Sequence, residues 1–232
     1  MNLSLFLFKV VQSSIIPLSP PRWRLPLFHF AHTRLNPIEP EVARLARFVP
    51  GGGVAIDAGA NAGLYSYGLS RFCKRVHSFE INPAHCRMLR DFAAPNVEIY
   101  GVGLSNTSEE KKLFIPIHSS GLALDGWASL EPGNCPGISE HKETPVCVSP
   151  LDEFNFPECV FLKIDVEGHE LQVLEGAIKT LRRTRPLILV EVRDNNIPAV
   201  EQFLEKLNYR RTDIRNYINC SGTPGNYFYT PS

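Results

Sequence analysis

The chain has 232 residues, enough for one well-buried domain and short for two. Its 24 lysines and arginines balance its 24 aspartates and glutamates without a long run of either sign, so we expect neither nucleic acid nor an anionic membrane as a partner. No stretch reaches the roughly eighteen uninterrupted apolar residues of a stable membrane span, and the six cysteines lack zinc-ligand spacing, which favours a cytoplasmic protein with reduced thiols.

Residues 1–38 form an apolar, proline-rich segment. Lys9 interrupts its apolar start, and four prolines follow without a small-residue cleavage site, which disfavours a secretory signal. We expect an arm that packs on the following domain, over 39–232, or on a neighbouring subunit. A short amphipathic helix over 39–48 is predicted to open that domain, because apolar residues recur there at helical spacing.

From residue 54 onward, predicted strands and helices alternate. The strands are predicted at 54–57, 75–80, 96–102, 159–164 and 186–192, and the helices at 62–73, 83–93, 168–182 and 197–207. Alternation of this kind predicts a parallel sheet with helices on both faces. The segment 209–229 is predicted to end the fold as an antiparallel hairpin.

An insertion at about 104–148 interrupts this alternation. A turn at 105–107 and a strand at 112–117 predict an inserted antiparallel pair, and 145–148 is predicted to be a short strand. Between the two strands lies a long segment that is rich in Gly, Ser and Pro.

That segment, residues 118–145, is long enough to need a function. Trp127 gives it apolar surface that a disordered loop rarely carries. We interpret it as a loop that covers a substrate, with His118, His141 and Glu143 as residues that could close over it.

The sequence V-A-I-D-A-G-A-N-A-G at 54–63 carries the strongest functional signal. An apolar strand ends on Asp57, and glycines at 59 and 63 let the backbone of the next turn approach a ligand that faces the following helix. A second strand ends on Glu80, where a carboxylate can accept both hydroxyls of a ribose. The alternative is a strand-to-helix turn whose glycines serve only packing.

Asp57 discriminates between nucleotide ligands. A dinucleotide fingerprint is G-x-G-x-x-G, whereas this turn has D-x-G-x-x-x-G and its carboxylate would repel a pyrophosphate. The carboxylate suits an ammonium or a sulfonium. S-adenosylmethionine has both cations, a ribose and no phosphate, so it is the predicted cofactor, and an NAD-dependent oxidoreductase is disfavoured.

Further acids follow later strands. Asp165 should leave its strand at the same sheet edge as Asp57, so the two are predicted to flank one cationic ligand. Glu167 is equally consistent with capping the next helix. His169 stands in the first turn of that helix, where the dipole would lower its pKa and suit it as a general base; the alternative is a surface residue. Nothing demands a metal, although Asp165, Glu167 and Glu191 could bind Mg²⁺.

The strings V-A-I-D-A-G-A-N-A-G-L-Y-S, H-S-F-E-I-N-P, F-L-K-I-D-V-E-G-H-E-L-Q-V-L-E-G-A and P-L-I-L-V-E-V together resemble the FkbM family of S-adenosylmethionine-dependent methyltransferases. The resemblance covers about residues 39–195, and G-W-A-S-L at 126–130 is also similar to that family. It implies one doubly wound α/β domain of the class I methyltransferase type, with a seven-stranded sheet whose last strand is antiparallel.

Carried over residue by residue, the resemblance also implies site roles. Glu80 would bind the ribose hydroxyls, and Asp165 would close the pocket near the transferring methyl. The residues implied around the methionine part are Asp57, Gly59, Asn61 and Gly63, and those near adenine are Gly101, Val102 and Gly103. The chain departs from the family in a short connection at 93–96 and in the variability that the family shows at His169.

The resemblance implies methyl transfer to a hydroxyl of a sugar or small metabolite, so the expected partner is a small-molecule or glycan acceptor. Asp165 and His169 are the two candidate bases. The alternative function is a catalytically inactive scaffold or regulatory subunit that binds the same cofactor. An ordered loop 118–145 with polar groups facing the pocket would favour the enzyme.

Overall fold

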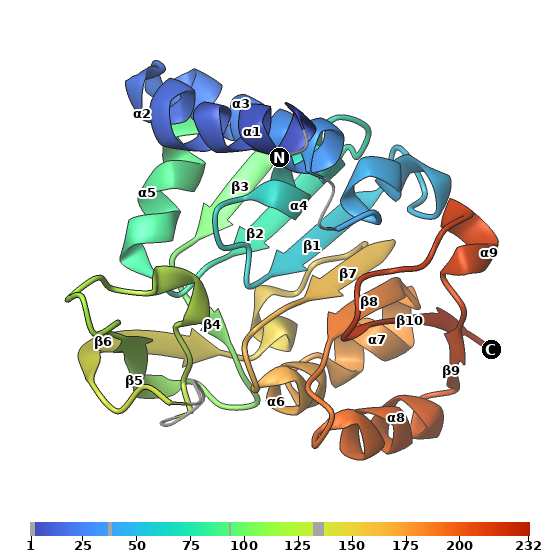
Figure 1. Ribbon diagram of the computed structural model, residues 1–232. Helices are drawn as coiled ribbons and strands as arrows, with labels where there is room; N and C mark the ends of the chain where they lie inside the picture. The colour runs from blue at the N-terminus through green and yellow to red at the C-terminus, as the bar shows by residue number, and fades with distance from the viewer. Residues whose placement is uncertain (1–2, 37–38, 93, 132–136) are drawn as a thin grey trace.

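A seven-stranded sheet runs through the computed structural model, which describes residues 3–36, 39–92, 94–131 and 137–232 (Figure 1). The strand order is β3-β2-β1-β7-β8-β10-β9; β10 is antiparallel to both neighbours, and the other adjacent pairs are parallel. The predicted doubly wound sheet with an antiparallel last strand is therefore confirmed. The strands are β1 (Val54–Ala58), β2 (Arg75–Phe79), β3 (Val97–Tyr100), β7 (Phe161–Ile164), β8 (Leu187–Glu191), β9 (Tyr209–Thr212) and β10 (Asn226–Pro231).

Helices cover both faces of this sheet because successive strand residues point to opposite sides. In β1, Ala55 packs with residues of η3, α4 and α9, whereas Ile56 packs with residues of α6, α7 and α8 on the other face. The elements on these two faces are η3 (Val42–Arg47), α4 (Leu64–Ser70) and α9 (Arg215–Ile218), and α6 (Glu170–Glu175), α7 (Ile178–Thr184) and α8 (Ile197–Lys206).

A second, three-stranded sheet forms from the insertion, with the order β4-β6-β5. The strands are β4 (Gly103–Leu104), β5 (Glu109–Pro116) and β6 (His141–Ser149). The prediction of an antiparallel pair within 104–117 is wrong, because β5 pairs antiparallel with the later β6 and β4 pairs parallel with β6. The turn at 105–107 therefore joins two strands that are not neighbours.

The loop after β5 folds back onto that strand. Phe114 and Ser129 exchange backbone hydrogen bonds of 2.8 and 3.0 Å, and a short 3₁₀ turn, η4 (Asp125–Trp127), lies just before Ser129. Residues 118–131 are thus held to the small sheet, next to the carboxyl edge of the large one. Another 3₁₀ turn, η5 (Leu151–Phe154), leads from β6 toward β7.

The helix predicted over 168–182 is interrupted, which is a further correction. It divides into α6 and α7 at Gly176, where a Cβ would lie 1.9 Å from the carbonyl oxygen of Ser105. Asp152 then accepts hydrogen bonds of 2.8 Å from the backbone amides of Lys179 and Thr180 in the first turn of α7. Close packing and a new capping residue therefore explain the break.

Residues 3–36 form a bent helical layer over α4 and α5 (Pro83–Phe92) (Figure 1). Leu25 is its main anchor, because it is buried with Leu89 of α5 and the turn residue Ala60. None of the described helices is long and apolar enough to cross a membrane. The expected boundary at residue 38 lies outside the described residues. The segments of this layer are α1 (Leu3–Val10), η1 (Val11–Ile15), α2 (Ile16–Leu18), α3 (Pro21–Phe30) and η2 (Ala31–Leu35).

Candidate functional site

The turn after β1 is fixed by contacts with two neighbouring strands. The amides of Gly59 and Ala60 both donate to the carbonyl of Phe79, each at 2.9 Å. Gly59 has φ +80°, and a Cβ there would stand 1.7 Å from the carbonyl oxygen of Asp165. Only glycine therefore lets the β1 turn meet the end of β7.

Gly63, at the start of α4, also has a packing role. Its φ is +90°, and a Cβ there would lie 2.5 Å from a methyl carbon of Leu89 and 2.9 Å from one of Leu25. The turn's two glycines are thus both required by protein packing, which was the simpler of the two interpretations of this motif. Asn61 stands between them in the left-handed region, with φ 48°.

Glu80 is held rigidly where β2 ends. Its Oε2 accepts a 2.6 Å hydrogen bond from the amide of Asn61, and its Oε1 accepts one of 2.7 Å from the amide of Asn82. Burial raises the pKa of Glu80 to about 7, and these two amide bonds oppose that rise. A carboxylate oriented in this way keeps lone pairs for further donors, such as paired hydroxyls.

Asp57 lies beneath the turn and outside the lining of the cavity. Its side chain is buried, and its Oδ2 accepts a 2.6 Å hydrogen bond from the Ser66 hydroxyl, which in turn lies 2.8 Å from that of Ser78. Burial raises the pKa of Asp57 to about 6, while Ser66 and Lys163 counter the rise. Any effect of Asp57 on a ligand therefore acts through the turn or through its charge.

Lys163 places a positive charge among the acids at the strand ends. It is fully buried, and its Nζ lies 3.8 Å from Asp165 Oδ2 and 3.9 Å from Glu191 Oε2. The same ammonium donates to Asn226 Oδ1 at 3.2 Å and lies 5.0 Å from the ring centre of Tyr65. An internal cation thus already lies between two of the three carboxylates considered for Mg²⁺.

The third of those carboxylates, Glu167, accepts a 2.8 Å hydrogen bond from Arg193. Among the described residues, no three His, Cys, Asp or Glu side chains have an arrangement that could hold a metal ion. The sequence-based magnesium hypothesis therefore gains no support from the geometry.

His169 precedes α6 and is almost fully buried. Its Nε2 lies 3.0 Å from the Ser105 hydroxyl, and its Nδ1 lies 3.5 Å from Glu131 Oε1. Burial is the main cause that lowers the pKa of His169, with Lys111 adding to the effect and Glu131 opposing it. The predicted direction of the shift agrees with the structure, but its main cause is desolvation and not the helix dipole. Both ring nitrogens face protein groups.

A cavity opens at the carboxyl edge of β1 and β2, between the large sheet and the loop after β5. It encloses about 670 Å³ that no atom occupies, part of it open to solvent. Its lining consists of Gly59, Asn61, Phe79, Glu80, Ile81, His85, Gly103, Leu104, Leu113, Asp125, Gly126, Ala128, Ser129, Leu130, Asp165, Val166, Glu167 and His169.

The structure thus brings together six of the sequence-predicted site residues and leaves four outside the lining. Those that line the cavity are Gly59, Asn61, Glu80, Gly103, Asp165 and His169; those outside it are Asp57, Gly63, Gly101 and Val102. His118, His141 and Glu143 also lie outside the lining, and Glu143 pairs with Lys112 at 2.7 Å.

The loop after β5 closes one side of the cavity through two hydrogen bonds to the main domain. Asp125 Oδ1 accepts from the Asn82 side chain at 3.1 Å, and the Ser129 hydroxyl donates to the Glu167 carbonyl at 2.8 Å. Asp125, Ser129 and His85 contribute to the lining without having been predicted individually. The sequence signals for this part of the site were the length of the loop 118–145 and the similarity of G-W-A-S-L to the family pattern.

A second cleft adjoins the cavity and shares Asp165 and Glu167 with it. Glu170 is a buried member of this cleft, and its Oε1 accepts a 2.6 Å hydrogen bond from the amide of Gly168. Burial raises the pKa of Glu191 in the same cleft to about 7. The other lining residues are Val192, Arg193, Asp194, Pro224 and Gly225.

Comparison with known proteins identifies the domain. The family model "Methyltransferase FkbM domain" matches residues 57–211. A crystal structure of methyltransferase FkbM from Methylobacillus flagellatus KT superposes with a TM-score of 0.56 at 14% identity, covering 98% of this chain and 58% of that one. The chain therefore spans less than two thirds of that protein's length. No curated protein matches the chain by sequence.

Two further structures are similar at lower scores. An rRNA methylase from Streptococcus thermophilus has a TM-score of 0.47 at 14% identity and covers 83% of this chain and 95% of its own. A Streptococcus mutans protein in complex with SAH has a TM-score of 0.48 at 14% identity, covering 82% and 93%. At such identities, structural similarity concerns the fold and not the substrate.

Proposed function

Since this chain belongs to the FkbM family of S-adenosylmethionine-dependent methyltransferases, we propose that it methylates a hydroxyl of a sugar or another small metabolite. The observation that carries this proposal is the cavity at the carboxyl edge of β1 and β2, where Glu80 and Asp165 face one space beneath an ordered loop. In doubly wound sheets this edge is the usual ligand position.

The residues present fit the cofactor. The oriented carboxylate of Glu80 would accept the ribose hydroxyls, and the turn at Gly59 and Asn61 would border the methionine part. Asp165 and Glu167 place two carboxylates on the opposite wall, and carboxylates suit a sulfonium. Gly103, with Ile81, would border the adenine, whereas Gly101 and Val102 would act from outside the lining.

The acceptor would reach the cofactor from the second cleft. Carboxylates accept hydrogen bonds from hydroxyls, and this cleft contains five, from Asp165, Glu167, Glu170, Glu191 and Asp194. Because Asp165 and Glu167 line both spaces, a hydroxyl bound in the cleft would lie next to the end of β7.

Bound S-adenosylmethionine supplies an electrophilic methyl group on a good leaving group, so the protein mainly has to align the acceptor, exclude water and remove a proton. We assign the proton to Asp165, whose carboxylate is partly exposed at the boundary of the two spaces. His169 is less suited, because its ring nitrogens face Ser105 and Glu131. We give it a positioning role between the loop and α6.

The rival function, a scaffold that binds the cofactor without catalysis, predicts a closed pocket with apolar walls. The loop after β5 instead contributes the polar side chains of Asp125 and Ser129 to the lining. Polar groups facing the reaction space favour the enzyme.

The test is incubation with S-adenosylmethionine labelled in its methyl group and a panel of sugars, glycans, hydroxylated metabolites and total RNA, read by mass spectrometry. Label in a hydroxyl of a small molecule or glycan, lost in Asp165→Asn, is the expected result. Label in RNA would overturn the proposed acceptor, and the absence of any product from a protein that binds S-adenosylhomocysteine would favour the scaffold.

A further inference from the structure

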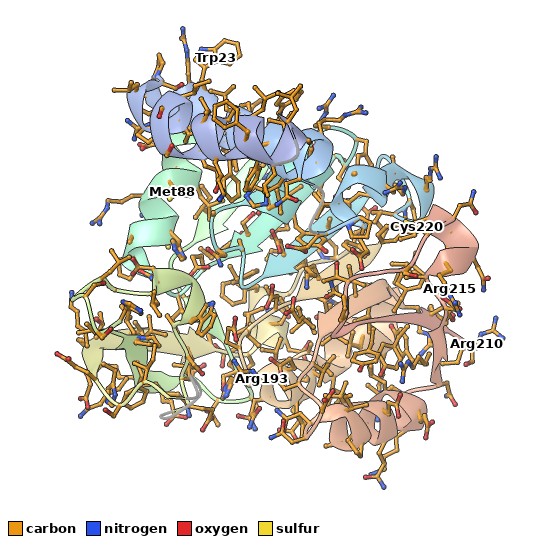
Figure 2. All side chains as sticks on the ribbon, viewed as in Figure 1. Trp23, Met88, Arg193, Arg210, Arg215 and Cys220 are labelled. Atoms are coloured by element: carbon orange, nitrogen blue, oxygen red, sulfur yellow. The ribbon has the colours of Figure 1, made fainter. Side chains whose placement is uncertain are left out.

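The N-terminal helical layer carries most of the large apolar side chains that the described structure exposes. Trp23 is 53% exposed and Leu18 is 86% exposed, and Figure 2 shows Trp23 pointing away from the rest of the molecule. The full set in this layer is Leu3, Leu5, Phe6, Leu7, Ile15, Leu18, Trp23 and Phe30. Apolar side chains gathered in one layer of a protein indicate an interaction surface.

The sequence of α3 separates an inner face from an outer one. Leu25 and His29, four residues apart, are buried toward the domain. Trp23 and Phe30, seven residues apart and so on one side of the helix, are each about half exposed, and Phe30 also borders a cleft against η3 and α4. Because Leu25 fills the space next to Gly63 and Leu89, the inner face is already occupied, and the outer one remains open to a partner.

The charge of this layer is one-sided. The first 38 residues contain no aspartate or glutamate, so all 24 acidic residues of the chain follow from Glu39 onward. The same 38 residues contain four basic ones, Lys9, Arg22, Arg24 and Arg34. The neutral total charge, from which no attraction to an anionic membrane was expected, therefore conceals a positive layer on a negative domain.

The histidines of the layer add nothing to this charge near neutral pH. Burial lowers the pKa of His29 to about 4, with nearby Arg71 adding to the effect, and burial also lowers the pKa of His32. The attraction thus depends on lysine and arginine, and it should persist at pH 7 and above and weaken with salt.

We propose that the outer surface of the N-terminal layer binds an anionic lipid surface, lying flat at the interface without crossing it. Tryptophan and phenylalanine are suited to the boundary between headgroups and acyl chains, and arginine and lysine attract anionic headgroups. The negative domain would be repelled by the same lipids, so binding would orient the molecule with α1 and α3 toward the membrane.

The charge distribution also favours a lipid surface over a second copy of the chain as the partner of this layer. A second copy of the chain could place its negative domain against this layer, but that arrangement leaves exposed tryptophan and phenylalanine facing charged side chains. A lipid surface satisfies both the apolar and the basic residues. Self-association is therefore an outcome that the experiment must distinguish.

The test is flotation of the full chain with vesicles of phosphatidylcholine alone and of phosphatidylcholine with about 30% phosphatidylserine. We expect binding to the anionic vesicles at least about tenfold tighter than to the neutral ones, and weaker binding in high salt. W23S/F30S and R22Q/R34Q should each weaken it about tenfold or more. Met88→Ser on α5 and Arg210→Gln on β9 are matched controls outside the layer, labelled in Figure 2, and should bind as the wild type does.

All these substitutions are at side chains on the surface, so thermal unfolding should confirm that the variants stay folded. Equal binding to both vesicle types, or equal loss in the control variants, would overturn the proposal. The proposal would also be overturned if the protein did not bind vesicles but self-associated with increasing concentration, and if W23S/F30S abolished that self-association. Binding of S-adenosylhomocysteine is measured alongside and should not change, which separates this proposal from the catalytic one.

Discussion

The carbonyl oxygen of Asp165 occupies the space that a side chain on Gly59 would need, 1.7 Å from the position of its Cβ. This contact joins two of the segments that carry the family resemblance, the turn after β1 and the K-I-D-V-E-G segment that ends β7. The shape of the cavity therefore depends on a backbone approach that only glycine permits.

Gly59→Ala should destabilise the protein by about 3 kcal/mol or more and abolish S-adenosylhomocysteine binding, because the new methyl meets backbone that cannot move aside. Gly52→Ala is the matched control: its φ is +75°, but a Cβ there would meet nothing within 4 Å. It should cost only about 1 kcal/mol. Urea unfolding measures the free energy of unfolding of both variants. Equal losses of stability would show that the contact between Gly59 and Asp165 is unimportant.

Glu80→Gln should weaken S-adenosylhomocysteine binding roughly 10- to 100-fold, because a neutral amide replaces a charged acceptor whose hydrogen bonds are the stronger kind. Its NH₂ group would also face the amide of Asn61 or Asn82. Isothermal calorimetry measures the affinity, with Glu98→Gln on the exposed face of β3 as the control. If the affinity of Glu80→Gln for S-adenosylhomocysteine stayed within twofold of the wild type, Glu80 would not be a cofactor-binding residue.

The buried carboxyl of Asp57 predicts a pH dependence of stability. Its pKa is raised from 3.8 to about 6, so between these values the folded protein keeps a proton that the unfolded chain releases. The protonated Asp57 therefore contributes fully to the free energy of unfolding below about pH 4, and this contribution is lost as the pH rises through about 6.

Asp57→Asn removes this titration while keeping an acceptor for Ser66. The stability of the wild type relative to this variant should fall by about 1–3 kcal/mol between pH 4.5 and pH 7.5, measured by urea unfolding at constant ionic strength. A difference that instead grows with pH would mean that Asp57 is ionised throughout and held by Lys163.

Substitutions at the two candidate bases, Asp165 and His169, should have different effects on kcat and on stability. Asp165→Asn should lower kcat by about 100-fold or more and leave S-adenosylhomocysteine affinity within a few-fold, because the variant keeps its shape but cannot accept the proton. His169→Asn should mainly lower stability, since it breaks a buried contact with Ser105. A full loss of kcat in a folded His169→Asn, with Asp165→Asn still active, would reverse the assignment.

The strands from β1 to β3 and from β7 to β8 could be predicted because short segments with apolar residues alternate regularly with helical patterns along the chain. The partner of β5 could not, since β6 follows only after a long loop and pairing across such a loop leaves no local pattern. The break between α6 and α7 was missed for a similar reason: Gly176 is close to Ser105 only in the folded chain.

The sequence predicted which strand ends border the site, but it did not predict which side chains at those ends point into the cavity. Glu80 and Asp165 line the cavity, but Asp57 does not, because it lies inside β1, one residue before the strand ends at Ala58, and its side chain is buried. Asp57 and Lys163 are register partners on β1 and β7 and share the buried side beneath the turn. The positive charge of the N-terminal layer is present in the sequence, but the balanced net charge of the whole chain does not reveal it.

The most direct measurement is calorimetric titration of the protein with S-adenosylhomocysteine and, separately, with NAD. We expect one site for S-adenosylhomocysteine, weakened in Glu80→Gln, and no measurable binding of NAD. Tight binding of NAD without any response to S-adenosylhomocysteine would contradict the assignment of this cavity to the methyl donor.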